Sequence, residues 1–417
     1  MKRIFYGWWV LLALLLTYMI TNGIILNTLP LFNPQLMDEF GLDNRQISKP
    51  AQVLYFLVAI MASFVGFLLD RYSPRRIMLI GAFILLIALA AFANAQSFRQ
   101  IRMIYMYYAI GLTLSGIVSS MYILTQWFVK YRGLAVGILL MGSSLGGALF
   151  NKIAGMSIVE FGWRGAAWIL FGCAVVGMAL PLLLIVRDNP AKLGLLPDGE
   201  PFSSSDNSFT SPSKVGITLP EAVTSTYFYL LLIATATLWF CITGIVNHQV
   251  IFIEKDLGKS KEVVTNVTSL FFLCSIVGKL LFGWLSDRFN KLSIMLLSIV
   301  NLLIGTVLLR YLPVLPPFMM YVYSLVYGIA FSGAFTMIQI VVAEEYNGIH
   351  YGRILGIFTT IDTIAGSLGI ASLGTIRKSS GSYLGAFELM IALCILACLC
   401  VLAMKYIKRS QLQVSSQ

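Results

Sequence analysis

Long apolar runs dominate this chain and restrict its fold more than any other feature. A helix rises about 1.5 Å per residue, so crossing a hydrocarbon layer about 30 Å thick takes about 20 mostly apolar residues. Runs of this length recur along the whole sequence, which therefore predicts an all-α membrane protein with twelve transmembrane helices. The expected spans are 7–32, 46–69, 76–94, 101–127, 133–156, 163–186, 226–251, 263–285, 292–311, 317–342, 353–376 and 383–406.

The composition supports this class and indicates an orientation. With 58% hydrophobic and 11% charged residues, the chain is too apolar for a soluble protein of 417 residues. Its net charge of +11 is expected to lie in the loops, with anionic lipid headgroups rather than nucleic acid as partner. Lys and Arg counted over the loops favour cytoplasmic termini, because positive residues are retained on that side. We expect a multi-pass protein of the plasma or bacterial inner membrane.

A short motif occurs twice, which indicates the duplication of a six-helix unit. Gly66-x-x-x-Asp70-Arg71-x-x-x-Arg75-Arg76 follows the second apolar run, and Gly283-x-x-x-Asp287-Arg288-x-x-Lys291 follows the eighth. Each copy is a tight basic turn between two expected spans, so we expect two pseudo-symmetric bundles, as in secondary transporters. The expected domains are an N-terminal six-helix bundle over 1–187, a cytoplasmic linker over 188–225, a C-terminal six-helix bundle over 226–409 and a polar tail over 410–417.

No part of the sequence indicates a catalytic domain. Pro, Gly and Ser are dense in the linker, including a Ser-rich run at 203–213, and this composition favours a flexible connection. The sequence has no phosphate-binding Gly-x-x-x-x-Gly-Lys-Ser/Thr loop and no His-Glu-x-x-His metal motif. Its six cysteines lie in expected spans without metal-ligand spacing, so we expect them to be reduced core residues. These patterns argue against an enzyme and predict no cofactor and no metal.

Further motifs give the chain a family resemblance. Tyr6-Gly7-Trp8-Trp9 opens the first span, Arg132-Gly133-x-Ala135-x-Gly137 the fifth, and Tyr351-Gly352-Arg353-x-x-Gly356 the eleventh. With Gly162-Trp163-Arg164, the linker start at 187–199 and the duplicated turn, they make the chain resemble the major facilitator superfamily over essentially its whole length. Within that superfamily, it resembles the monocarboxylate porters and their oxalate:formate antiporter relatives.

The resemblance implies that the two Asp-containing turns latch the cytoplasmic side. A carboxylate that faces a helix N-terminus is stabilised by free N–H groups and partial positive charge. By pseudo-symmetry, Asp70 is expected near Gly352 and Arg353, at the start of the eleventh helix. Asp287 is expected at the start of the fifth helix, near 132–133. The alternative is that these loops only fix topology through positive charge. The expected gate residues are Asp70, Arg71, Arg75, Arg132, Asp287, Arg288 and Arg353.

Two ionisable residues are expected at membrane depth, where a charge is costly and usually faces a cavity or a partner. Lys279 lies about 12 Å along the eighth helix from Asp287, at a position where the resemblance implies an arginine that holds the substrate carboxylate. A lysine balances a carboxylate as a point charge, without the bidentate fork of arginine. Asp362 lies about 15 Å into the eleventh helix from Gly352. We expect Lys279 to bind substrate and Asp362 to carry the coupling proton through an ion pair with Lys279; a permanent structural ion pair is the alternative.

Polar and aromatic residues, most of them on the first, fourth, seventh and tenth helices that line the cavity in this superfamily, are further candidates for substrate contact. Asn22 and Tyr122 are the preferred two, and hydrogen bonding between helices is the alternative role for each candidate. Lys152, His248 and Glu388 are expected near the membrane interface. The remaining candidates are Asn27, Gln52, Tyr55, Trp239 and Tyr327.

These features predict a secondary active transporter that moves a small organic anion, a monocarboxylate, by alternating access with proton coupling. The expected partners are a small carboxylate, protons and membrane lipids, and the expected working unit is a monomer. Three alternatives remain: exchange of two carboxylates, proton-driven export of drugs, and a receptor-like sensor with the same fold. Drug exporters are expected to carry Gly-Pro where this chain has Gly147-Ala148, which disfavours export.

Overall fold

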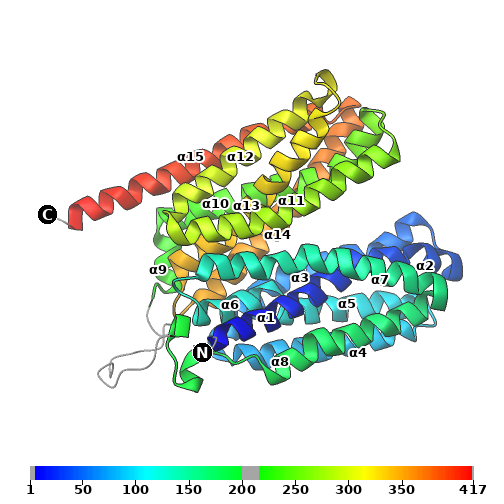
Figure 1. The fold of residues 1–417 in the computed structure, drawn as a ribbon, viewed down its shortest axis with the longest axis horizontal. Helices are drawn as coiled ribbons and strands as arrows, with labels where there is room; N and C mark the ends of the chain where they lie inside the picture. The colour runs from blue at the N-terminus through cyan, green and yellow to red at the C-terminus, as the bar shows by residue number, and fades with distance from the viewer. Residues whose placement is uncertain (1–4, 200–215, 416–417) are drawn as a thin grey trace. The chain divides into compact units, whose positions relative to one another are not determined.

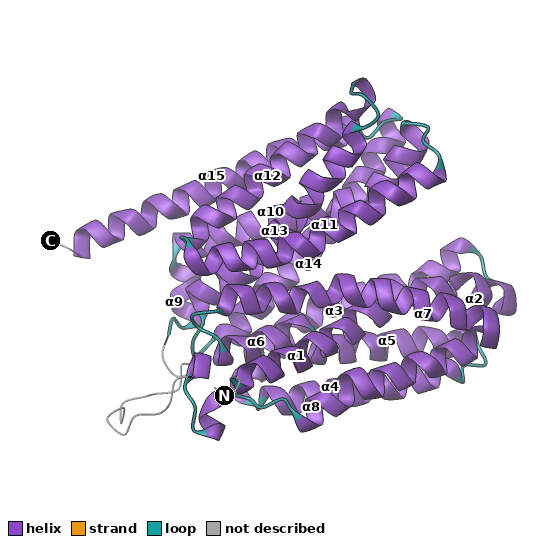
Figure 2. Cartoon of the chain, in the orientation of Figure 1, coloured by secondary structure: helices purple, strands orange, loops and turns teal. Residues whose placement is uncertain are grey.

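The computed structural model describes residues 5–199 and 216–415, and nearly all of them are helical (Figures 1 and 2). The Ser-rich run at 203–213 and the basic residues at 2–3 lie outside the described residues. Contacts divide the chain into two compact units. Unit 1 consists of Met1–Gly216 and Tyr346–Thr360, and unit 2 of Ile217–Glu345 and Ile361–Gln417. The domain boundaries expected from the sequence stay a prediction.

Unit 1 contains the first series of long helices, together with short segments that continue or connect them. Its α-helices are α1 Tyr6–Tyr18, α2 Asn33–Phe40, α3 Asn44–Arg71, α4 Pro74–Ala93, α5 Phe98–Ser115, α6 Ile117–Trp127, α7 Arg132–Ala174 and α8 Leu180–Leu184. Its 3-10 and π segments are η1 Met19–Thr28, η2 Leu29–Phe32, η3 Val175–Ala179, η4 Pro190–Leu193 and η5 Pro197–Gly199.

Unit 2 contains the second series, and it shares α14 with unit 1. Its α-helices are α9 Leu219–Thr224, α10 Thr226–Ile251, α11 Lys261–Arg288, α12 Lys291–Tyr311, α13 Met319–Tyr346, α14 Tyr351–Ser380 and α15 Leu384–Ser415. Two short segments, η7 Phe252–Asp256 and η8 Leu312–Val314, complete it. The residues of α14 up to Thr360 group with unit 1, and those from Ile361 with unit 2.

The twelve expected spans are accounted for in the described residues. Eleven helical runs are long and apolar enough to cross a membrane. The longest run, Arg132–Leu184, contains two of the expected spans. Gly162, with φ 67° and ψ 175°, breaks the helix between them. Glycine adopts this positive φ readily because it has no Cβ. The predicted all-α membrane architecture is therefore confirmed.

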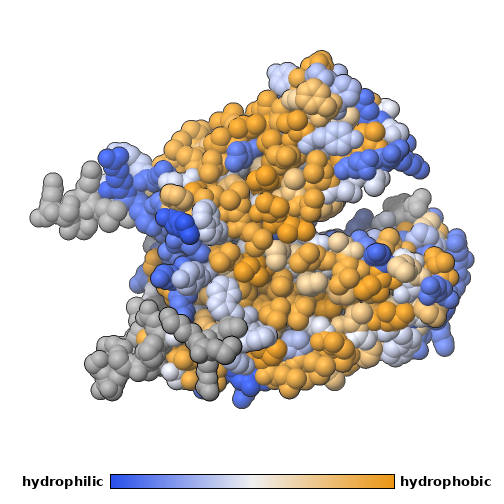
Figure 3. Space-filling view, in the orientation of Figure 1, coloured by the Kyte–Doolittle hydropathy of each residue, from blue (hydrophilic) through white to orange (hydrophobic). Residues whose placement is uncertain are grey.

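The surface has the hydropathy pattern of a membrane protein. Apolar side chains cover the middle of the helices, and hydrophilic residues gather toward their ends (Figure 3). Large apolar side chains such as Phe56 (66% exposed) and Val159 (86% exposed) have no protein neighbour that removes them from solvent. Lipid is the medium in which such a surface is stable.

The first span changes from α-helix to π-helix at Met19, and the π-helix η1 continues to Thr28. Such segments are rare and frequently occur at functional sites. Gly23 lets η1 lie directly against α7, since a Cβ at this position would be 2.6 Å from the carbonyl carbon of Gly146. The π-helix also carries Asn22 and Asn27, two of the candidate cavity residues.

Candidate functional site

Lys279 lies in the interior of α11, and 2% of its surface is exposed. Its Nζ atom lies 5.8 Å from the centroid of the Phe335 ring on α13. A cation near an aromatic face is attracted by the ring quadrupole, by about 0.5–2 kcal/mol. Trp239 of α10 packs in a T-shaped arrangement against Phe335, with 5.3 Å between ring centroids. These three residues, from three helices of unit 2, are called the Lys279 cluster below.

Close packing of α11 against α13 explains how Phe335 reaches Lys279. A Cβ at Gly278 would lie 2.1 Å from the Ser332 Oγ atom and 2.8 Å from the carbonyl oxygen of Ile329, so glycine is required for this approach. Phe335 lies three residues after Ser332 and therefore on the same face of α13. Lys279 directly follows Gly278. The glycine contact thereby brings the cation and the ring together.

Asp362 is buried in α14, with 3% of its surface exposed. It lies beside Thr235 of α10, whose hydroxyl donates to the carbonyl oxygen of Leu232 at 3.2 Å. Among the described residues, no group is hydrogen-bonded to its Oδ1 atom. The ion pair between Asp362 and Lys279 that the sequence led us to expect stays a prediction. Thr235 lies one helical turn before Trp239, so α10 contacts both the acid and the Lys279 cluster.

Tyr327 occupies a packed column of rings. Its ring stacks on Tyr323 and Phe271, with centroid distances of 5.4 and 6.0 Å, and none of its surface is exposed. Its hydroxyl has no hydrogen-bond partner among the described residues. A substrate could reach this side chain only after the column rearranged. The expected substrate contact of Tyr327 stays a prediction.

The candidate residues of unit 1 have different surroundings. Asn22 accepts a hydrogen bond from Asn27 (3.3 Å) and donates one to the Tyr18 hydroxyl (3.4 Å). Tyr55 on α3 is 46% exposed. Tyr122 on α6 is 7% exposed and packs against the ring of the first residue of α14, at 5.8 Å. A polar pair on the π-helix and an accessible phenol are thus present, and their contact with substrate stays a prediction.

Asp70, near the end of α3, contacts the start of α14. Its Oδ1 accepts a hydrogen bond from the backbone N–H of Gly352 at 2.8 Å, and its Oδ2 accepts one from the N–H of Arg353 at 3.1 Å. The Asp70 side chain is 2% exposed, and the Nε of Arg353 lies 3.4 Å from its Oδ2. The first N–H groups of a helix have no partner within the helix, so a carboxylate stabilises them strongly. The contact expected for Asp70 is present.

A glycine contact holds α3 and α14 at this close distance. A Cβ at Gly66 would lie 2.0 Å from the carbonyl oxygen of Gly352, and a Cβ at Gly352 would lie 2.4 Å from that of Gly66. Farther along both helices, the hydroxyls of Ser63 and Thr360 are 2.8 Å apart. Asp70 therefore reaches α14 because the two backbones touch.

Two of the expected gate arginines lie over one ring, and a third has a different contact. The guanidinium groups of Arg71 and Arg353 lie 4.2 and 5.0 Å from the centroid of Phe67. Arg75 instead donates from Nη2 to the carbonyl oxygen of Leu183 at 2.5 Å, near the end of α8. A cation at a helix C-terminus satisfies carbonyl groups that have no partner within the helix.

Arg132 and Arg288, two more of the expected gate residues, contact groups within four residues of themselves. Arg132 donates from Nε to the carbonyl oxygen of Phe128 at 3.2 Å. Arg288 lies over the ring of Trp284, 4.2 Å from its centroid. The expected contact of Asp287 with the start of α7 involves residues of different units and stays a prediction.

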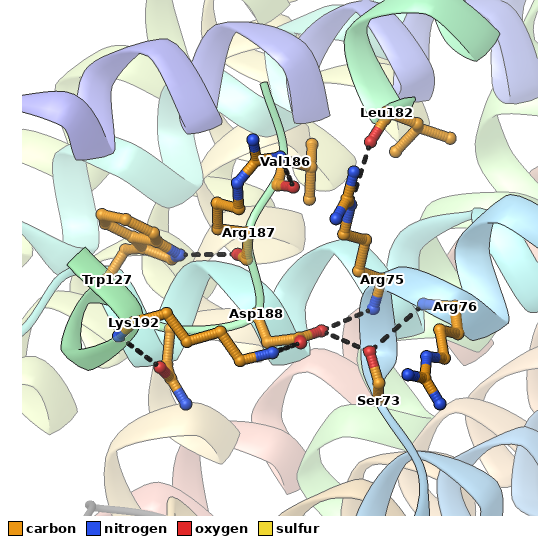
Figure 4. A network of polar contacts seen from close by, with 10 residues as sticks. Ser73, Arg75, Arg76, Trp127, Leu182, Val186, Arg187, Asp188 and Lys192 are labelled. Atoms are coloured by element: carbon orange, nitrogen blue, oxygen red, sulfur yellow. Dashed lines mark hydrogen bonds and ion pairs between the residues drawn. The ribbon is translucent and has the colours of Figure 1, made fainter. Parts of the chain in front are cut away.

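Asp188 lies at the centre of a polar network that sequence reasoning did not assign to a site (Figure 4). Its Oδ1 accepts hydrogen bonds from the Ser73 hydroxyl at 2.8 Å and from the backbone N–H of Arg75 at 2.9 Å, while Lys192 bonds its Oδ2. Burial opposes the charge on this carboxylate, but the bonds from Lys192, Arg75 and Ser73 outweigh it and hold the pKa of Asp188 below its usual range.

Asp198 makes a second contact of the same kind. Its carboxylate accepts from the backbone N–H groups of Val129 (3.1 Å), Lys130 (2.7 Å) and Tyr131 (3.4 Å), directly before α7. Three successive N–H groups form a concave site for an anion. Asp198 has φ 61°, a conformation that few residues other than glycine adopt. The Pro197-Asp198-Gly199 turn is the sequence signal that could have indicated this role.

The three residues expected at interfaces have simple surroundings. The ring nitrogens of His248 lie 2.8 Å from the Tyr383 hydroxyl and 3.0 Å from a carbonyl oxygen of α14. Glu388 forms an ion pair with Arg310 at 2.8 Å, and Lys152 is exposed. The contacts of His248 and Glu388 fit structural roles.

The sequence matches a known family over nearly its whole length. The family model described as the Major Facilitator Superfamily matches residues 10–252 and 246–416. The chain belongs to the Major Facilitator Superfamily. It is therefore a multi-pass membrane transporter and not an enzyme, and its substrate is a small molecule.

Relatives within this superfamily carry different names. The uncharacterised transporter YcxA of Bacillus subtilis is 25% identical over 93% of this chain and 91% of its own length. Monocarboxylate transporter 13 of Bos taurus is 24% identical over 92% of this chain and 85% of its own. Other matches are named as probable hexose phosphate transport proteins of Chlamydia and a phosphoglycerate transporter of Salmonella typhimurium. The names of relatives therefore do not agree on one substrate.

Solved structures agree with the fold. The human organic anion transporter MFSD10 (TETRAN) superposes with a TM-score of 0.73 over 95% of this chain and 98% of its own, at 14% sequence identity. At a sequence identity this low, the structural similarity shows the fold and nothing about the substrate.

Proposed function

We propose that this Major Facilitator Superfamily transporter moves a small organic anion, a monocarboxylate, by alternating access, with Lys279 as the group that binds the anion. The observation that carries this proposal is the lysine buried at membrane depth against an aromatic ring. A charged side chain at the centre of a membrane helix costs about 2.5–3.5 kcal/mol on insertion scales, and such residues mark substrate and ion pathways.

The Lys279 cluster suits an anion with a small apolar body. The ammonium group is a compact point charge that pairs with a carboxylate. Phe335 and Trp239 supply apolar faces beside it, against which a short hydrocarbon chain would pack. The positive charge of the cluster comes from Lys279, which favours a monoanion over a dianion.

Asp362 is proposed as the proton site. A buried carboxyl group beside a hydroxyl suits a group that alternates between charged and protonated forms. Since Asp362 lies beside Thr235, we propose that protonation acts on the Lys279 cluster through α10, which carries Thr235 and Trp239. A ligand shifts the populations of the inward-facing and outward-facing states only by the difference between its affinities for the two states.

Two other substrate types remain as alternatives within the superfamily. Exchange of two carboxylates, in the manner of oxalate:formate antiporters, would use the same anion site without the proton. Sugar phosphates and phosphoglycerate are suggested by the names of relatives, but a phosphate carries about 1.5–2 negative charges and requires more cations than the Lys279 cluster provides. Drug export would not require Lys279.

Gating is proposed for the Asp-containing turns, with both termini cytoplasmic. Asp70 holds the first turn of α14 through two N–H groups, and a contact of this kind can open and close as a unit. Arg71, Arg75, Arg132, Arg288 and Arg353 would support the two turns, with Asp287 as the second latch. The protein is proposed to work as a monomer in the cytoplasmic membrane.

Uptake into proteoliposomes tests the proposal. Lactate, pyruvate, acetate, oxalate, formate and glucose 6-phosphate are compared with and without an inward proton gradient. Uptake of a monocarboxylate that is lost in Lys279→Ala and retained in Lys152→Ala, which removes an exposed lysine, supports the anion site. Asp362→Asn should remove the proton dependence. Uptake of glucose 6-phosphate alone, or full activity without Lys279, contradicts the proposal.

A further inference from the structure

Residues 186–199 leave the end of α8 and follow the ends of other helices in unit 1 instead of entering the linker directly. Aromatic side chains hold the backbone at the start of this segment. The Tyr6 hydroxyl donates to the carbonyl oxygen of Ile185 at 2.7 Å, and the indole N–H of Trp127 donates to that of Arg187 at 3.0 Å. The segment is called the strap below.

The strap contributes a carboxylate at each of two helix starts. Asp188 binds Ser73 and the N–H of Arg75, at the first turn of α4. Asp198, ten residues later, binds three N–H groups in the turn before α7. Between them, η4 and the left-handed Gly194 (φ 66°) fold the strap compactly. Two separate helix starts are therefore bonded to one short segment.

Packing at the far end of the strap supports the second contact. A Cβ at Gly199 would lie 2.7 Å from the ring of Phe5. The same ring lies 5.9 Å from Trp127 and 5.8 Å from Phe128, measured between centroids. The end of the strap and the end of α6 thus share one aromatic neighbour. The backbone strain at Asp198 persists because bonds on one side and rings on the other hold it.

We propose that the strap makes the starts of α4 and α7 move as one rigid unit, with Asp188 and Asp198 as positioning residues. The two helix starts adjoin residues of the proposed gate. Asp70 lies three residues before Ser73, and Arg132 directly follows Tyr131. A strap bonded at both points makes the α3–α4 turn and the start of α7 move together, so that the gate residues they carry change position in one step.

Two independent helix caps would be the simpler role for these carboxylates. A cap protects the N–H groups that it bonds and no others. A strap also transmits the loss of one contact to the other, because both contacts lie on one folded segment. The decisive observation is therefore the behaviour of the α4 start after the contact at α7 has been removed.

Amide hydrogen exchange on the full-length protein in detergent makes this measurement without a substrate. Asp198→Asn removes the charge, while Asp198→Gly also relieves the positive φ and so keeps the chain folded. Glu221→Gln is the control, since it removes a linker carboxylate that caps α9 instead. We expect exchange to rise about tenfold at 129–131 in both Asp198 variants, together with a clear rise at 75–76. No change in the control is expected at either place.

The reciprocal variant and a rate measurement complete the test. Asp188→Asn should raise exchange at 129–131 as well as at 75–76. If either variant changes only the amides next to it, the carboxylates are separate caps and the inference is wrong. The rate measurement rests on the proposed function: lactate uptake should lose turnover in Asp198→Gly while KM stays unchanged. A raised KM with unchanged turnover would also overturn the inference. Absence of lactate uptake in the unmodified protein would count against the proposed function only, because hydrogen exchange still decides the strap.

Discussion

Substituting alanine for Gly66 should open the contact between Asp70 and α14. A Cβ at Gly66 would lie 2.0 Å from the carbonyl oxygen of Gly352, whereas ordinary contacts begin at 3.4 Å. Relief of the clash moves the two backbones apart by about 1.4 Å, which is the difference between these values. The hydrogen bond from the N–H of Gly352 to Asp70, now 2.8 Å, would then exceed 4 Å and be lost.

The expected loss is large because the bonds are charge-assisted. Each hydrogen bond to a charged group contributes about 1.5–3 kcal/mol, so losing two raises the open population roughly a hundredfold or more. The N–H groups of Gly352 and Arg353 lie in the first turn of α14, where helices provide no internal partner. Their protection from hydrogen exchange therefore depends on Asp70. Exchange at these two amides should rise about a hundredfold in Gly66→Ala.

The control uses a glycine with free space around it. A Cβ at Gly172 in α7 would have no atom within 4 Å, so Gly172→Ala should leave exchange at Gly352 and Arg353 unchanged. Asp70→Asn keeps the helices in contact and should give a smaller rise than Gly66→Ala. Unchanged exchange in Gly66→Ala would refute the reasoning, since the helices would then have absorbed the methyl group without separating.

Three further predictions concern other contacts. The pKa of Asp188 lies below its usual range, so the stability it contributes is present above the ordinary pKa of an aspartate, about 4, and is lost as the pH falls through the lower pKa of the folded state. The loss of thermal stability in Asp188→Asn should therefore be largest near neutral pH and shrink as the pH falls below about 4. Arg164→Lys removes the two hydrogen bonds from Arg164 to Glu39, whose nitrogen–oxygen distances are 2.7 and 3.0 Å. Because the pair is exposed, this change should lower the free energy of unfolding by only about 1 kcal/mol. Thermal unfolding of the purified protein measures the effects of the Asp188 and Arg164 substitutions. Phe335→Leu removes the ring beside Lys279 and should weaken lactate binding about threefold to tenfold. Isothermal titration measures this effect, with Phe331→Leu as the control. An equal effect of the control would contradict a specific role for Phe335.

The architecture could be predicted because it depends on local sequence properties. Each span is long and apolar enough to be recognised alone, and the break at Gly162 falls between the two spans expected at 133–156 and 163–186. The change to π-helix in η1 could not be predicted, because the apolar pattern from Met19 to Thr28 resembles that of an α-helix. Hydropathy records burial and not the pattern of backbone hydrogen bonds.

The site could be predicted only in part, for a similar reason. Spacing along a helix places Lys279 and Asp362 at depth, and both are buried. It does not say which neighbour each side chain faces: Asp362 lies beside Thr235, and its pairing with Lys279 stays a prediction. The contact of Asp70 was predictable because the duplicated turn has a defined partner in the family. Asp188 bonds the Ser73 hydroxyl, the N–H of Arg75 and Lys192, and no residue pattern marks this set; for Asp198, the Pro197-Asp198-Gly199 turn is the signal that the sequence offers.

Direct binding of lactate and pyruvate to the purified protein tests the central claim most directly. Isothermal titration is performed on the unmodified chain, Lys279→Ala and the Lys152→Ala control. Removing one partner of a buried charge pair costs about 2–5 kcal/mol, so affinity should fall at least thirtyfold in Lys279→Ala. The control should bind as the unmodified chain does. Equal carboxylate affinity in all three proteins would contradict Lys279 as the anion-binding group.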